Sequence, residues 1–417
     1  MSIFERIISR GATAILTLLL AVFTGPETVG KYATVILAMT IHQALTDSVI
    51  RQVGVEAWNY SNGPAFVRRS AVISGISGVV IVASATGLVA ASDFSWEILL
   101  KVLPLVLVPV VTANYLSILT KAQRTPTGWK AIAKAQGIAS VVSLAVAVPL
   151  LPVIDIGAAS LQLLIAETLF LFLISKHSSL GGDLENPAPL WRNYYLPTAL
   201  SSVLGWSQSQ LERLILVLLS SPSTVGIYSL AIAVARTASD AITSGLVNAI
   251  RSQIATERSV ELRQFQLRRG IRIGVRVSLL MQFGITVACL FVLPLILDSS
   301  WSEALDVAPI FAVTGVFAAV IWVTSAYIIS DGQSNRLITA QVVGIALSLL
   351  CGYLLNVSLM AGALMCIFRD VIGLILRLYI VKDSLDRKSI VAVVAFLAAA
   401  ILLGIGSQIG FFAGSVS

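Results

Sequence analysis

The stretch Pro26-Glu27-Thr28-Val29-Gly30-Lys31-Tyr32 returns 196 residues later as Pro222-Ser223-Thr224-Val225-Gly226-Ile227-Tyr228, with five of the seven residues identical. A long apolar run precedes each copy and another follows it. A second echo, made of three residue pairs that recur 205 residues on, lies near the end of each half: Ala135-Gln136, Ser143-Leu144 and Gly157-Ala158 return as Ala340-Gln341, Ser348-Leu349 and Gly362-Ala363. Internal repeats in a chain that is hydrophobic throughout are typical of alternating-access transporters, so the repeat bears on function as well as on fold.

The composition excludes an ordinary soluble protein. Of the 417 residues, 57% are hydrophobic and 12% are charged, and the mean hydropathy is +0.91. A soluble domain carries about 25% charged residues. The deficit extends over the whole chain, which indicates a polytopic membrane protein.

Continuous Leu, Ile, Val and Ala runs predict membrane helices, each of about 20 residues. A β-barrel would show alternating residues in short segments instead. We expect thirteen spans, at about 7–24, 30–50, 70–91, 99–119, 131–150, 155–175, 194–219, 224–250, 273–297, 304–329, 337–356, 359–380 and 389–411.

The repeat divides these spans into two lobes of six helices, at 1–190 and 191–382, and leaves an additional transmembrane helix at 383–417. Six is an even number, so the lobes run in the same direction through the membrane as parallel repeats. The fold class is therefore an all-α polytopic membrane protein. Within the repeated phrase, we expect Pro to set a turn and Thr to cap the following helix.

Basic residues cluster in alternate loops, and this predicts a cytoplasmic N-terminus. The net charge of +7 follows from that bias and does not indicate nucleic-acid binding. The three cysteines lie within apolar runs, and no Cys/His cluster has metal-ligand spacing, so we expect no metal and no cofactor.

Two segments resemble a known family. Thr24-Gly25-Pro26-Glu27 through Tyr32 is similar to the LGPEEYGLY phrase of polysaccharide-export flippases of the Wzx type. Glu212-Arg213 before Leu214-Ile215-Leu216, and then Val225-Gly226-Ile227-Tyr228-Ser229, resemble their D-R/K-L-L-L and VGIYS segments. The chain departs from the family in having Glu212 where Asp is usual and in having thirteen spans rather than twelve or fourteen.

The resemblance places the chain in the multidrug/oligosaccharidyl-lipid/polysaccharide exporter superfamily. It implies two six-helix bundles around a central cavity that opens alternately to either side of the bacterial cytoplasmic membrane. The implied cargo is an undecaprenyl-pyrophosphate-linked oligosaccharide, flipped outward for surface polysaccharide synthesis. Membrane lipids are implied partners, as is a polysaccharide polymerase or chain-length regulator.

Charged residues within spans are the candidate site residues, because a charge at mid-bilayer costs about 2.5–3.5 kcal/mol on insertion scales. Arg213 shares a helical stripe with Trp206 and Gln210. Its planar guanidinium can donate paired hydrogen bonds to a pyrophosphate, and Trp206 and Gln210 can contact sugar. The alternatives for Arg213 are an ion pair with a neighbouring helix or snorkelling to the interface.

Two further pairs of candidate residues each combine a positive and a negative charge. Arg236 and Asp240 lie four residues apart, as a self-neutralised pair or with Arg236 available to an anionic headgroup. Arg369 and Asp370 are adjacent on a helix, so we expect one to face the cavity and the other a packed helix.

Glu167 is the candidate acid of the first lobe. With Asp240 and Asp370, it suits coupling to a proton or sodium ion, although we favour a neutral, hydrogen-bonded structural carboxyl. Thr40 and Ala44 occupy the positions of Arg236 and Asp240 in the first copy of the repeat. The cationic side of the site is therefore expected in the second lobe.

Three functions remain open. The first choice is a lipid-linked oligosaccharide flippase, which is not an enzyme because no covalent bond changes. A cation-coupled multidrug antiporter would favour more acids and fewer arginines among these residues. A membrane glycosyltransferase or polymerase needs positioned acid/base groups, and the outer loops are short and carry no His.

Overall fold

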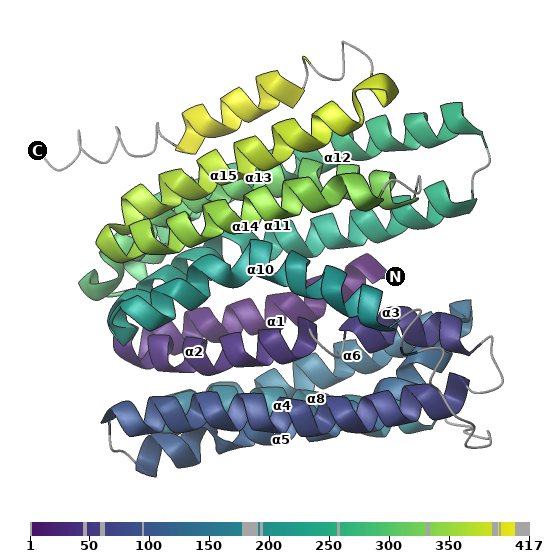
Figure 1. Ribbon diagram of the computed structural model, residues 1–417. Coiled ribbons are helices and arrows are strands. Elements are labelled where there is room, and N and C mark those ends of the chain that lie inside the picture. The colour runs from purple at the N-terminus through teal and green to yellow at the C-terminus, as the bar shows by residue number, and fades with distance from the viewer. Residues whose placement is uncertain are drawn as a thin grey trace, which may run out of the picture. The chain divides into compact units, whose positions relative to one another are not determined.

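The residues that the computed structural model describes are almost entirely helical, with short turns between the helices and no strand (Figure 1). The described residues are 2–44, 48–58, 63–93, 96–176, 191, 195–256, 259–330, 334–385, 391 and 393–404. They form two compact units, Met1–Ser207 and Gln208–Ser417, and each is described by itself. Residue 190, where the first lobe is predicted to end, lies outside the described residues, so the predicted boundary stays a prediction.

The first unit is a bundle in which α5 is central. Its helices are α1 (Ser2–Phe23), α2 (Pro26–His42), α3 (Ser48–Ala57), α4 (Gly63–Asp93), α5 (Trp96–Ala122), α6 (Pro126–Ala147), the single turn α7 (Leu151–Ile154) and α8 (Ile156–Ser175). Helix α5 packs between α4 and α8, while α6 packs against both α8 and α1. Tyr115 of α5 and Phe170 of α8 stack edge to face, with ring centroids 4.9 Å apart.

Helix α10 (Leu196–Leu219) begins in the first unit and ends in the second. The second unit continues with α11 (Pro222–Thr256), α12 (Val260–Val287), α13 (Ser302–Ser330), α14 (Ser334–Val357) and α15 (Leu359–Ile380), and a shorter apolar helix spans Val393–Gly404. The almost wholly buried α13 packs against α11, α12 and α15 and takes the central place that α5 has in the first unit.

Eight helices of the described residues are long and apolar enough to cross a membrane. They are Gly63–Val89, Trp96–Ala122, Thr127–Ile154, Ile156–Ser175, Val260–Leu295, Ser299–Ile329, Arg336–Val357 and Leu359–Ile380. Each coincides with one of the thirteen predicted spans. The other five predicted spans also contain helix, in α1, α2, α10, α11 and Val393–Gly404, but fall outside this set.

Both copies of the repeated phrase start a helix with proline, which suits the first helical turn because its missing N–H is not needed there. The prediction that Thr caps these helices is wrong. Gly25 is the N-cap of α2, and in the second copy Ser221 Oγ accepts the backbone N–H of Thr224 at 3.3 Å. A proline at the first position makes the preceding residue the cap, so the threonine lies inside the helix.

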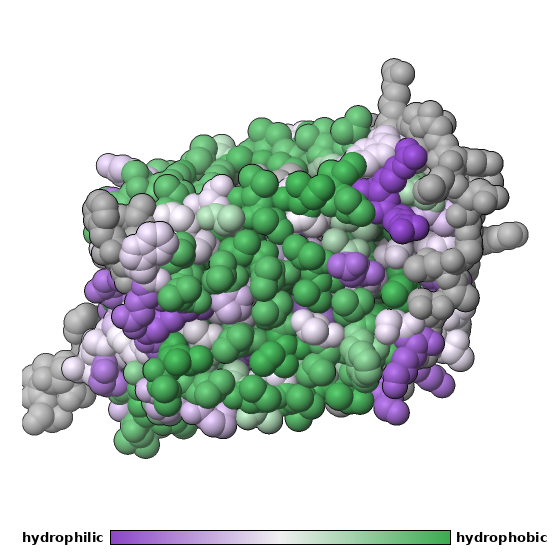
Figure 2. Space-filling view, turned by 90° about the horizontal axis from the view of Figure 1, so that it is seen from below, coloured by the Kyte–Doolittle hydropathy of each residue, from purple (hydrophilic) through white to green (hydrophobic). Residues whose placement is uncertain are grey.

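Apolar side chains cover the surface of the first unit between polar ends. Figure 2 shows a broad hydrophobic band with hydrophilic residues gathered at either end. Exposed apolar residues along α4 and α5 include Val72, Ile76, Val80, Leu103 and Leu107. Such a band suits contact with lipid chains and, with the eight apolar helices, describes a multi-pass membrane protein.

Candidate functional site

Small residues on one face of α14 bring α10 into close contact. Gly344, Ser348 and Gly352 are four residues apart and so lie on one helix face. A Cβ added to Gly344 would lie 2.7 Å from the Gln208 side chain, and one on Gly352 would lie 2.5 Å from the Cβ of Ile215. Ser348 Oγ donates to the carbonyl oxygen of Gln208 at 3.0 Å. This is the close approach that small residues spaced by four permit between membrane helices.

A buried charge cluster lies beside this contact. Arg369 on α15 donates from Nη1 to Glu212 Oε2 at 2.5 Å and from Nε to Asp370 Oδ1 at 2.9 Å. The same Nη1 lies 3.1 Å from Ser348 Oγ. Arg369, Glu212 and Asp370 are only 4%, 3% and 8% exposed. Because unpaired charges are costly in a low-dielectric interior, these partners hold one another in place and join α10, α14 and α15.

Arg377 lies two turns beyond Arg369 on α15 and is also buried. Its Nε donates to Ser325 Oγ at 2.9 Å, and its Nη1 donates to the carbonyl oxygen of Gly373 at 2.8 Å. Its Nη2 reaches Gln208 Oε1 at 3.4 Å. These partners are neutral, so hydrogen bonds rather than a direct ion pair accommodate this charge.

On α11, Arg236 and Asp240 form a looser pair. Arg236 Nη2 lies 3.5 Å from Asp240 Oδ1, and the two side chains are 15% and 20% exposed. Within the described part of the chain, neither the buried Nε of Arg236 nor Asp240 Oδ1 has a hydrogen-bond partner. A guanidinium offers five N–H donors. Arg236 therefore keeps hydrogen-bonding capacity for a further group.

The predicted stripe on α10 is divided between the two units. Trp206 lies in the first unit, where its Nε1 donates to Thr40 Oγ1 of α2 at 3.1 Å. Gln210 and Arg213 are half-buried and lie in the second unit. Arg213 Nη2 donates to Ser229 Oγ of α11 at 3.4 Å.

Glu167 lies in the first unit, where Tyr115 Oη donates to its Oε2 at 2.6 Å. This is the hydrogen-bonded setting favoured from the sequence. Of the other two acids suggested for ion coupling, Asp370 is bonded to Arg369 and Asp240 is paired with Arg236. No group of three metal-ligating side chains occurs in the part of the chain that the structure describes.

The expectation that Arg369 and Asp370 face different surroundings is wrong. Adjacent helical positions point about 100° apart, but the long arginine side chain folds back until its Nε meets the neighbouring carboxylate, and both are buried. Sequence reasoning also missed Glu212 and Arg377 as members of the polar core. The small-residue spacing on α14 was the readable signal that another helix would lie there.

The helices α10, α11 and α15 carry two more positive than negative charges within the second unit. The arginines are Arg213, Arg236, Arg251, Arg369 and Arg377, and the acids are Glu212, Asp240 and Asp370. With all eight ionised, five positive and three negative charges leave a net charge of +2. The excess favours an anionic ligand over a cationic one.

Comparison with known proteins places the fold. No protein-family model and no curated protein sequence matches the chain. Among solved structures, the lipid II flippase MurJ in an inward closed conformation aligns with 98% of this chain and 96% of its own, at a TM-score of 0.72 and 12% sequence identity. The chain has the fold of the MOP-superfamily transporters.

Multidrug resistance MATE transporters of the MOP superfamily also match. An inward-facing structure aligns with 92% of this chain and 99% of its own, at a TM-score of 0.60 and 10% identity. An outward-facing structure aligns with 94% of each chain, at a TM-score of 0.60 and 12% identity. At such identities the likeness to MOP transporters establishes the fold, and these neighbours are transporters rather than enzymes.

Proposed function

We propose that this MOP-type transporter moves an undecaprenyl-pyrophosphate-linked oligosaccharide from the inner to the outer leaflet of the bacterial cytoplasmic membrane. The proposal rests on the fold, on the flippase-like segments around Pro26 and Glu212, and on the excess of arginine in α10, α11 and α15. Surface polysaccharide synthesis is the purpose such cargo serves, with a polymerase or chain-length regulator as the proposed partner.

The observation that carries the proposal is the incomplete hydrogen bonding of Arg236. Arg369 directs its Nε and Nη1 to protein groups, whereas Arg236 has a distant carboxylate at 3.5 Å and a buried Nε with no partner in the described residues. A buried donor left without an acceptor costs about 1–3 kcal/mol. A pyrophosphate oxygen would relieve that cost while the cargo is bound.

The remaining predicted residues take supporting roles in this proposal. Arg213, on the neighbouring helix α10, supplies a second cation for the pyrophosphate, and Gln210 and Trp206 contact sugar. Arg369 acts as a positioning residue, because it holds α10 and α15 together through Glu212. Asp240 and Asp370 remain the candidates for ion coupling, whereas Glu167, hydrogen-bonded to Tyr115, takes a structural role.

The test is mass spectrometry of polyprenyl-pyrophosphate lipids in cells that lack the gene and carry a variant copy. The wild-type copy should clear the accumulated lipid-linked oligosaccharide, and an R213Q/R236Q variant should leave it at the level of the deletion strain. R236K should fall between them, because lysine keeps the charge but loses the planar fork. A matched control is R68Q/R69Q, which removes two exposed charges from α4.

Normal export by R213Q/R236Q at wild-type protein levels would contradict the assigned roles. Absence of any accumulated lipid in the deletion strain, with an intact surface polymer, would contradict the flippase function itself. In that case sensitivity of the deletion strain to cationic drugs would support the multidrug antiporter.

A further inference from the structure

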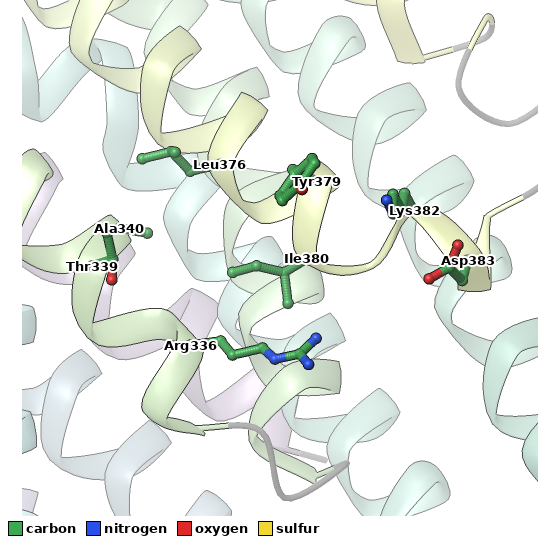
Figure 3. Close-up of a pocket in the computed structure, with 8 residues that line it drawn as sticks. All are labelled: Arg336, Thr339, Ala340, Leu376, Tyr379, Ile380, Lys382 and Asp383. Carbon is green, nitrogen blue, oxygen red and sulfur yellow. The ribbon is translucent and has the colours of Figure 1, made fainter.

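A pocket of about 520 Å³ opens between the first turn of α14 and the end of α15. In Figure 3 the Arg336 side chain extends from α14 toward Ile380 of α15, and Lys382 lies on the turn that follows. The eight lining residues are Arg336, Thr339, Ala340, Leu376, Tyr379, Ile380, Lys382 and Asp383. The volume falls within the roughly 300–1,000 Å³ of sites that hold small molecules.

The polar side of the pocket carries two cationic side chains, Arg336 and Lys382. Arg336 and Lys382 are both exposed, and neither has a carboxylate within 4.0 Å among the described residues. Lys382 Nζ instead lies 4.9 Å from the centre of the Tyr379 ring. A third cation, Arg268 of α12, donates from Nε to the backbone carbonyl of Ser384 at 3.3 Å, next to the pocket. Asp383 offsets only part of this charge.

The other side of the pocket is apolar, and exposed apolar residues lie on the same two helices. Leu376 and Ile380 line it. On the same two helices, Ile375 is 56% exposed and Val342 is 53% exposed. The ring of Tyr379 is 70% exposed where the polar and apolar sides meet, a position that tyrosine favours at membrane interfaces. A soluble anion would use the cations alone, whereas a lipid uses both sides.

We propose that this pocket binds the headgroup of an anionic phospholipid of the bilayer. Arg336 and Lys382 contact the phosphate, Thr339 Oγ1 donates a hydrogen bond to it, and the acyl chains lie along the exposed faces of α14 and α15. The predicted orientation places the pocket at the cytoplasmic end of both helices, where basic pockets between membrane helices bind anionic lipid. The site does not depend on the cargo, so the flippase function and this site can fail separately.

The experiment is native mass spectrometry of the full-length protein in detergent, titrated with phosphatidylglycerol or with zwitterionic phosphatidylethanolamine. Wild-type protein should retain phosphatidylglycerol in preference to phosphatidylethanolamine. R336Q/K382Q should bind phosphatidylglycerol about 25-fold more weakly, since each juxtamembrane cation contributes roughly fivefold. D383N should bind it more tightly, which gives a second variant whose effect has the opposite sign.

R68Q/R69Q serves as the charge-matched control, because it removes two exposed cations from α4, outside the second unit. Melting temperatures without lipid should be the same for all four proteins, since the substituted side chains are exposed. Equal binding by wild type and R336Q/K382Q, or an equal loss in the control, would overturn the site. So would displacement of phosphatidylglycerol by millimolar inorganic phosphate. A preference for undecaprenyl pyrophosphate over phosphatidylglycerol would assign the pocket to cargo instead.

Discussion

Two serines at equivalent positions of the repeat, one in each half of the molecule, have different hydrogen-bond partners. Ser143 on α6 accepts a hydrogen bond from the neutral Gln162 of α8 at 2.9 Å. Its repeat counterpart, Ser348 on α14, lies 3.1 Å from the guanidinium of Arg369 on α15. Both serines are fully buried. The repeat preserves the helix contact while the chemistry at that contact changes from neutral to ionic.

Positions around these serines also differ between the two halves, and one of them changes from a neutral residue in the first half to a charged residue in the second. The buried stripe Ala139, Ser143 and Ala147 corresponds to Gly344, Ser348 and Gly352. The fully buried Leu16 of α1 occupies the repeat position of Glu212. The first half therefore builds this region from apolar packing and a neutral hydrogen bond, and the second half builds it from paired charges. Arg213 and Arg236, which we propose bind the pyrophosphate, both belong to the ionic half.

The largest effect is expected from removing the charge at the centre of the second-half cluster. R369L leaves Glu212 and Asp370 buried without their cation, which costs about 3–5 kcal/mol of unfolding free energy. The matched change in the first half, Q162L, removes one neutral hydrogen bond and costs about 1 kcal/mol. Unfolding in mixed detergent micelles measures both. Equal losses would show that the two halves do not differ as described.

A smaller effect is expected from adding one methyl group to the α10–α14 contact. The Cβ of G352A would lie 2.5 Å from the Cβ of Ile215 and 2.9 Å from the backbone oxygen of Glu212, and overpacking of this kind costs about 1–3 kcal/mol. Ala147 holds the corresponding position in α6 and already carries that methyl group. The melting temperature of G352A should fall, and an unchanged value would show that α10 is free to move away.

Y115F should lower the unfolding free energy by about 1 kcal/mol. The substitution removes the hydrogen bond to Glu167 without changing the packing of the ring. E167Q keeps an acceptor for Tyr115 and should preserve both stability and transport. Transport assays in the complemented deletion strain check this. Loss of transport by stably folded E167Q would assign ion coupling to the first half. It would then be wrong to place the functional charges in the second half alone.

The smallest stability change is expected when the second half receives the residues of the first. E212L/R369L/D370I places Leu16, Leu164 and Ile165 at their repeat positions. Replacing a whole buried ion cluster by apolar residues is often neutral for stability, so the unfolding free energy should recover most of the loss seen in R369L. Transport should still be lost. Transport by this triple variant would show that the cluster serves folding alone.

The sequence predicts the helices better than it predicts their contacts. The apolar runs located eight membrane helices, and the repeated phrase located the start of α2 and α11. The arginines within α10, α11 and α15 were also readable, because charges in apolar runs are rare. The partners of Arg369 could not be predicted from the sequence, because Glu212 lies 157 residues away along the chain. Only the packing of α10 on α15 brings the two side chains together. The fold-back of Arg369 onto Asp370 depends on a rotamer, which helical periodicity does not specify.

The close contact between α10 and α14, fastened to α15 through Arg369, has a mechanical consequence. Breaking it during a transport cycle would expose three charges, so these helices should travel as one rigid body. Conformational change must then be absorbed elsewhere, and the turn at Ser220–Ser221 between α10 and α11 is a natural hinge. Spin labels on α10 and α15 would keep a constant separation through the cycle, while labels on α10 and α11 would not.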